Sequence, residues 1–311
     1  MTADFSTLAC SEQARSIGEP LPGTAPQATA WVVIEQAGAW GAKALLDADL
    51  PDGVGPAVAR ASSGSGTGVL LARHPDRTVR QAHTSTQGTR VWVADVRGAS
   101  AKLCTGFLDD VSAVAHWDFH AIAAGSLPAA VEPTTDPLLL VCTQGHRDAC
   151  CARIGRPSLD ALLQALGPTR RHLAWEASHI GGHRFAPTLL ALPTGSVHGR
   201  VDGTQAHLVL QGTVRMELVD LGLRGRTCLS PPAQVADVVI RQHINDWRVP
   251  SLTLTSQDAS DGEVSVEVRH QDGREWTVLV IEEPLARPRA ESCGADLRNG
   301  SALRVTAIHA A

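Results

Sequence analysis

Three cysteines and two histidines lie close enough along this chain to form one metal centre. Cys142, Cys150 and Cys151 fall within the stretch CTQGHRDACC, and His179 and His183 flank a glycine pair in HIGGH. Thiolates and imidazoles are the ligands of zinc sites and of some iron–sulfur clusters. These residue types at this density predict metal binding. The alternative is that they are buried side chains that only pack.

Both groups follow directly after expected strands. The apolar run 137–142 (PLLLVC) is typical of a strand covered on both faces, and 172–178 (HLAWEAS) predicts a second strand that ends just before His179. In open α/β sheets, ligand sites lie beyond the carboxyl ends of strands. We therefore expect Cys142 and His179 at the same edge of a sheet. The glycine pair leaves room there for backbone to approach an inorganic group.

The spacing of the cysteines bears on the kind of metal. Eight residues separate Cys142 from Cys151, whereas structural zinc sites usually pair cysteines about two to four residues apart. A [2Fe–2S] core is longer than a single ion and tolerates ligands on longer, separate loops. The spacing favours an iron–sulfur cluster, and zinc and simple packing stay open as alternatives.

The pattern C-x8-C followed by H-x-G-G-H resembles that of the sucrase/ferredoxin-like family, thioredoxin-like ferredoxins with bis-histidinyl [2Fe–2S] clusters. The match extends to 175–186 (WEASHIGGHRFA), to 223–234 (LRGRTCLSPPAQ) and to the opening stretch 18–41. The resemblance therefore covers most of the chain. It implies a thioredoxin-like fold for the middle of the chain.

The resemblance also implies a ligand set. Cys142 and Cys151 would bind one iron of a [2Fe–2S] cluster, and His179 and His183 would bind the other, reducible iron. The family pattern selects Cys151, so its neighbour Cys150 would be an additional thiol outside the ligand set.

Departures from the family pattern fall outside the ligand positions. Members often carry His where Gln144 stands, and a small residue with Asn where Pro187-Thr188 follow HRFA. These differences bear on the surroundings of the cluster. His146, between the two cysteines, is expected to face solvent, and Arg147 with Asp148 to form a local ion pair or loop cap.

The elements around the motif predict an α/β (α+β) protein of three parts. Residues 1–134 form an N-terminal α/β domain, 135–247 a thioredoxin-like [2Fe–2S] ferredoxin domain, and 248–311 a C-terminal antiparallel β region. A weak echo between 78–96 and 172–192 suggests that the N-terminal domain is a thioredoxin-like unit without ligands. The C-terminal region is expected to be structural cover.

Within the middle part, two local features are predicted. Residues 158–167 (SLDALLQALG) form an amphipathic helix with Ser158 as its N-cap and Gly167 as its stop. A hairpin turns at Thr194-Gly195. The Pro-containing stretch 123–137 is predicted to be an inter-domain linker.

Composition excludes several classes of function. The 311 residues carry 27 Lys and Arg against 32 Asp and Glu, so the basic excess expected of a nucleic-acid-binding or membrane-surface protein is missing. No apolar stretch approaches the roughly 20 residues of a membrane span, and the first residues lack the pattern of a signal peptide. We expect a cytoplasmic protein. Only Lys43 and Lys102 are lysines, which indicates a G+C-rich bacterial genome.

These observations favour a one-electron carrier with proton-coupled redox chemistry over an enzyme with its own substrate. Its partner would be a redox protein or a small redox-active molecule. Two alternatives belong to other classes: a structural Cys2His2 zinc module, and a thiol–disulfide oxidoreductase using Cys142 with Cys150 or Cys151. The missing C-x-x-C pair counts against the latter. The sequence gives no strong indication of the paired carboxylates that sucrose hydrolysis would need.

Overall fold

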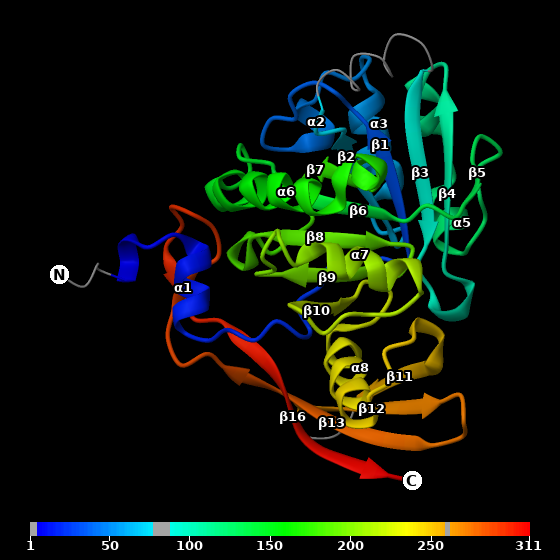
Figure 1. The fold of residues 1–311 in the computed structure, drawn as a ribbon. Coiled ribbons are helices and arrows are strands. Elements are labelled where there is room, and N and C mark those ends of the chain that lie inside the picture. The colour runs from blue at the N-terminus through cyan, green and yellow to red at the C-terminus, as the bar shows by residue number, and fades with distance from the viewer. Residues whose placement is uncertain (1–4, 77–87, 259–261) are drawn as a thin grey trace.

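The computed structural model describes residues 5–76, 88–258 and 262–311 (Figure 1). Its main feature is a ten-stranded mixed sheet in the order β10-β9-β8-β6-β7-β2-β1-β3-β4-β5. A second, four-stranded antiparallel sheet has the order β11-β12-β13-β16. The predicted mixture of α and β structure is confirmed.

The first half of the large sheet comes from the N-terminal part of the chain. Strand β1 is parallel to β2 and antiparallel to β3, which continues antiparallel to β4. Its strands are β1 (Ala30–Glu35), β2 (Thr67–Arg73), β3 (Thr89–Asp95), β4 (Lys102–Leu108) and the short β5 (Glu132–Thr134), with helices α2 (Ala44–Asp47), α3 (Val54–Ser62) and α5 (Phe119–Ala123). Because β5 pairs with β4, part of the expected linker 123–137 belongs to the sheet.

The second half repeats this arrangement. Strand β6 is parallel to β7 and antiparallel to β8, which continues antiparallel to β9. The strands are β6 (Leu138–Cys142), β7 (Ala174–Ala177), β8 (Thr188–Leu192), β9 (Ser196–Gly199) and the edge strand β10 (Leu223–Arg226), with helices α6 (Ala149–Arg170), α7 (Ala206–Val214) and α8 (Pro231–Ile244). The hairpin predicted at Thr194-Gly195 is confirmed, since it joins β8 to β9.

The two halves meet through their equivalent second strands. β2 and β7 pair antiparallel, with Ala72 opposite Ala177 and Arg73 opposite Glu176. Trp92 of β3 packs edge-on against Trp175 of β7, with ring centroids 4.7 Å apart. One hydrophobic core therefore draws side chains from both halves. Of the proposed echo, residues 78–87 lie outside the described part of the chain.

The C-terminal part packs on α8 and then returns to the N-terminus. The four-stranded sheet is formed by β11 (Leu252–Asp258), β12 (Glu263–His270), β13 (Glu275–Pro284) and β16 (Ser301–Ala310), and the segment before β16 carries the two short strands β14 (Arg289–Ala290) and β15 (Leu297–Arg298). Figure 1 shows this segment beside helix α1 (Cys10–Ser16). The Ala290 N–H donates to Gln13 at 2.8 Å, and Arg289 pairs with Glu19 at 2.8 Å.

Helix α6 differs from its prediction at its start. It begins at Ala149 rather than after Ser158, because Asp148 caps it by accepting the N–H of Cys150 at 2.8 Å. Ser158 lies inside the helix and donates to the Ile154 carbonyl. The expected stop at Gly167 corresponds to a kink, where a φ of 65° interrupts the helical backbone.

A glycine allows α6 to lie directly on β6. A β-carbon at Gly155 would lie 2.1 Å from the carbonyl oxygen of Cys142, which is backbone and cannot swing aside. This contact sets the position of the two elements that carry Cys142 and Cys151.

Replacing Gly155 by Ala should therefore push α6 away from β6. Overpacking costs about 1–3 kcal/mol, which exceeds the roughly 1 kcal/mol that alanine gains in helix propensity. We expect a net loss of stability on the order of 1 kcal/mol, measured by chemical denaturation. Ala165→Ser, at an exposed position of the same helix, is the control. A Gly155→Ala protein as stable as wild type would contradict this explanation.

Candidate metal centre

Two adjacent parallel strands bring Cys142 and His179 to one edge of the sheet. Cys142 is the last residue of β6 and lies opposite Ala177, the last residue of β7. His179 follows two residues later. The expectation that neighbouring strands deliver these two residues to the same edge is confirmed.

Cys151 reaches the same place from the first turn of α6. The sulfurs of Cys142 and Cys151 and a ring nitrogen of His179 all lie within 4.8 Å of one another. Both cysteines are 1% exposed, and His179 is half-buried. Three of the four predicted ligands therefore converge on one point.

His183 lies at the border of this group. Its ring centroid is 5.0 Å from that of His179, and its Nε2 lies 2.7 Å from the carbonyl oxygen of Glu291. Because a carbonyl only accepts, Nε2 carries the proton of the neutral ring and Nδ1 holds the free lone pair. The Nδ1 atoms of His183 and of His179 are both buried, and neither has a hydrogen-bond partner among the residues that the structure describes.

These orphaned nitrogens provide a test of whether the residues suit a metal group. A buried polar atom without a partner is costly unless something binds it. Two buried thiols beside two imidazoles, of which His183 offers a free Nδ1 lone pair, form a soft N/S donor set of the kind that zinc and iron–sulfur clusters use. The residues present fit such a group.

The glycine pair between the histidines is required by the local backbone. Gly181 and Gly182 have φ values of 103° and 71°, in the region that favours glycine. A β-carbon on Gly182 would also lie 2.5 Å from the guanidinium of Arg224, which donates to the Gly181 carbonyl at 2.8 Å. The buried Arg224 thus holds the loop that carries His183.

The electrostatics of the centre favour one thiolate. Hydrogen bonding to Cys151, together with the His179 ring and the Gln144 N–H, holds the pKa of Cys142 well below its usual value despite burial. The same interaction with Cys142, and burial, raise the pKa of Cys151. Burial lowers the pKa of His183, so this ring is neutral and able to offer a lone pair at neutral pH.

Gln144 connects the centre to the other half of the protein. Its side-chain oxygen accepts the backbone N–H of His179 at 2.7 Å, and its amide nitrogen donates to the carbonyl of Gly41 at 2.9 Å. This residue stands where family members often carry His. Its side chain fixes the backbone of His179.

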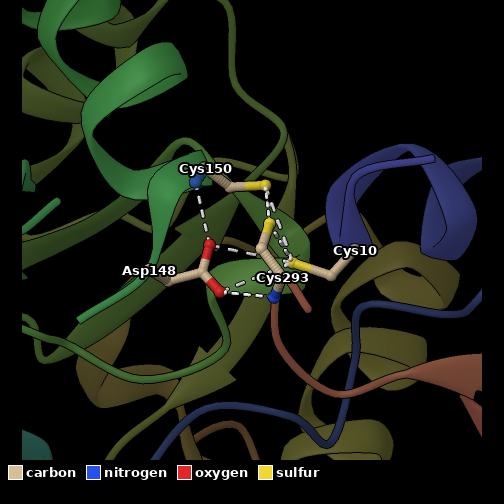
Figure 2. Close-up of side chains that lie close together, drawn as sticks. All are labelled: Cys10, Asp148, Cys150 and Cys293. Atoms are coloured by element: carbon tan, nitrogen blue, oxygen red, sulfur yellow. Dashed lines mark hydrogen bonds between the residues drawn. The ribbon is translucent and has the colours of Figure 1, made fainter. Parts of the chain in front are cut away.

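Cys150 points away from this centre. Its sulfur lies with those of Cys10 and Cys293, next to the carboxylate of Asp148 (Figure 2). Hydrogen bonds from Cys10 and Ser11 lower the pKa of Cys150 to about 6. His146 is exposed, as expected, and Asp148 is the helix cap.

Sequence reasoning missed this second group. It treated the C-terminal region as structural cover, whereas Cys293 of that region joins the group. Cys10 and Cys293 are 283 residues apart, so no local spacing relates them. The one available indication was that several of the seven cysteines had no assigned role.

Comparison with known proteins identifies the family. The family model described as Sucrase/ferredoxin-like matches residues 21–225, about two thirds of the chain. The chain therefore belongs to the sucrase/ferredoxin-like family. No curated protein and no solved structure matches it. Within the described residues, no helix is long and apolar enough to cross a membrane.

The position of Gln144 yields a prediction about metal retention. Gln144→Ala removes the acceptor of the His179 N–H, so the ring loses its fixed position. Loss of such outer contacts typically weakens metal binding roughly 10–100-fold. We expect this variant to lose its metal at a correspondingly lower chelator concentration. Metal analysis after dialysis against increasing chelator measures the loss. Gln164→Ala, at an exposed position of α6, is the control, and equal loss from both variants would refute the positioning role.

Proposed function

We propose that this protein is a one-electron carrier whose [2Fe–2S] cluster is held by Cys142, Cys151, His179 and His183. The observation that carries the proposal is the convergence of two buried thiols and a ring nitrogen of His179, with the His183 ring 5.0 Å from that of His179. Among the described residues, the buried Nδ1 atoms of both histidines have no hydrogen-bond partner. Membership in the sucrase/ferredoxin-like family supports the same function.

Each ligand residue has a distinct part in this proposal. A bound [2Fe–2S] cluster supplies one reversible electron, and imidazole in place of thiolate raises its reduction potential. Cys142 and Cys151 are buried and exclude water from their side of the site. His179 and His183 are half-buried, so they form the side through which a redox partner would exchange electrons.

The histidines also hold protons. With Nδ1 as the ligand atom of His183, the proton stays on Nε2, where the Glu291 carbonyl accepts it at 2.7 Å. The Asp148 carboxylate is 3.7 Å from the same nitrogen. The pKa of a ligating imidazole would respond to the charge of its metal. In the alkaline range, Nε2 would therefore lose its proton in the oxidised state and regain it on reduction.

We also propose that each half of the large sheet is a thioredoxin-like unit. In both halves the first strand lies between a parallel second strand and an antiparallel third, with the fourth outside the third. Residues 1–134 would be the unit without ligands, 135–247 the ferredoxin unit, and 248–311 a C-terminal β region that covers them.

Anaerobic purification with metal and sulfide analysis tests the function. The proposal requires red-brown protein with about two iron and two sulfide per cluster and an EPR signal on reduction. The approach of three ligand atoms within 4.8 Å would also suit a single zinc ion, which leaves this centre colourless. Colourless protein with zinc on Cys142 and Cys151, or a Cys142–Cys151 disulfide, would overturn the electron-carrier proposal.

Serine substitutions test the register of the cysteine ligands. Cys142→Ser or Cys151→Ser should lose most of the iron and visible absorption, because a hydroxyl is a poor substitute for a thiolate. Cys150→Ser should keep both, since its sulfur points to the second group. Iron analysis and absorption spectra measure this. Bleaching of Cys150→Ser with retention of colour in Cys151→Ser would place the ligand one residue earlier.

Cysteine substitutions test the histidines. His179→Cys or His183→Cys should keep a cluster, but the added negative charge stabilises its oxidised state, so the midpoint potential should fall by roughly 100 mV or more. The pH-dependent step of the replaced imidazole should disappear, removing a slope of up to about 60 mV per pH unit. Voltammetry against pH measures both. Variants whose potential and slope equal those of wild type would exclude the histidines as ligands.

A further inference from the structure

Three cysteines and one carboxylate meet at a second point, although they come from three distant parts of the chain. Cys10 comes from the first turn of α1, Asp148 and Cys150 from the start of α6, and Cys293 from the segment between β14 and β15. All four side chains point toward one another in Figure 2. Their ligand atoms lie within 4.8 Å of one another.

The distances suit a single tetrahedral ion. The sulfur of Cys10 lies 3.6 Å from those of Cys150 and Cys293, which are 3.2 Å from each other. The carboxylate oxygens of Asp148 lie 3.8 and 3.9 Å from the Cys10 sulfur. Zinc with bonds of ~2.3 Å to sulfur and ~2.0 Å to oxygen would separate its tetrahedral ligands by about 3.8 Å between sulfurs and 3.5 Å between sulfur and oxygen.

Three of the four side chains are shielded from water, and the group has a hydrogen-bond donor nearby, so it can hold negative charge. Cys10 is 0% exposed, Cys150 2% and Asp148 5%, within a small apolar cluster of alanines and Ile154. The Ser11 hydroxyl lies 3.2 Å from the Cys150 sulfur. Such an environment is typical of ligating thiolates, which keep their negative charge only with nearby donors or a cation.

Asp148 is oriented toward this point by two backbone donors. Its Oδ1 accepts the N–H of Cys150 and its Oδ2 accepts the N–H of Cys293, each at 2.8 Å. A carboxylate has about four lone-pair positions, so one stays available on each oxygen. The two bonds join the chain segments that supply two of the three thiols.

We propose that Cys10, Cys150, Cys293 and Asp148 form a structural zinc site, separate from the centre at Cys142 and Cys151. Three thiolates select soft or borderline ions. A carboxylate as the fourth ligand of a closed tetrahedral site suits zinc. The sulfurs lie too close together to belong to separate irons of one cluster.

The zinc ion would join the N-terminal helix and the C-terminal segment to the start of α6. The Cys293 segment also supplies the Glu291 carbonyl that accepts the His183 Nε2–H, and Asp148 lies between the two sites, 3.7 Å from the same nitrogen. The zinc site would therefore fix the segment that orients one imidazole of the first centre, without belonging to it.

A disulfide explains the group less well. Cys150 and Cys293 are the closest pair, at 3.2 Å, and a disulfide between them would leave Cys10 and the aligned carboxylate without a role. A tetrahedral ion uses all four groups. Both possibilities can be distinguished by experiment.

Metal analysis of the full chain, purified anaerobically with zinc in the medium, tests the proposal. We expect about one zinc per chain. Cys10→Ser and Cys293→Ser should lose the zinc and keep visible absorption, Cys142→Ser should lose iron and keep zinc, and Cys228→Ser, at a half-buried cysteine outside both groups, should keep both metals. If the electron-carrier proposal fails, iron is absent, and any zinc at the first centre is lost in Cys142→Ser. If the zinc proposal fails, Cys10→Ser and Cys293→Ser lose no zinc. The two failures are therefore distinguishable.

X-ray absorption at the zinc edge of the wild-type chain gives an answer that does not depend on the variants folding. The proposed site requires three sulfur neighbours and one oxygen, whereas zinc at Cys142, Cys151, His179 and His183 would show two sulfurs and two nitrogens. Zinc absent from the protein, zinc with two sulfur ligands, or a Cys150–Cys293 disulfide found by mass spectrometry of the unreduced chain would each overturn the proposal.

Discussion

The contact of Gly155 with the carbonyl of Cys142 is the constraint on which the rest of the site depends. Only a residue without a β-carbon lets α6 approach β6 so closely. That approach brings the first turn of α6 to the end of β6, where the strand delivers Cys142. Cys151 then lies beside Cys142 and, through the parallel pairing of β6 with β7, beside His179.

Helix geometry gives the neighbouring cysteines different surroundings. Successive residues of a helix point roughly 100° apart, so Cys151 faces the sheet edge while Cys150 faces α1 and the C-terminal segment. Asp148 caps the helix and also accepts an N–H from the Cys293 residue. The start of α6 thereby supplies a thiol to each of the two groups. Its cap, Asp148, belongs to the second group and lies 3.7 Å from His183 of the first centre.

The large sheet explains how its first half supports the metal centre, although that half carries no predicted ligand. β2 pairs with β7 beside the site, and Arg73 of β2 forms an ion pair with Glu176 of β7 at 2.7 Å. Gln144 bonds to the loop at Gly41 and to the His179 backbone. Both contacts cross between the halves, so the first half is part of the support of the centre.

The sequence by itself determined the features that depend on residues close together along the chain. The apolar run ending at Cys142, the strand ending before His179 and the glycine pair at Gly181 indicated a metal centre at a sheet edge, because periodicity and spacing act over short distances along the chain. The family followed from the same motif. The start of α6 was placed wrongly, since the cap at Asp148 was not recognised.

Only the tertiary structure decided which residues meet across long separations. Cys10 and Cys293 join Cys150 because the C-terminal segment returns to α1 after the four-stranded sheet. The hydrogen bond from His183 to the Glu291 carbonyl and the role of Gln144 arise in the same way. Such contacts depend on the packing of whole elements, and no pattern of neighbouring residues encodes them.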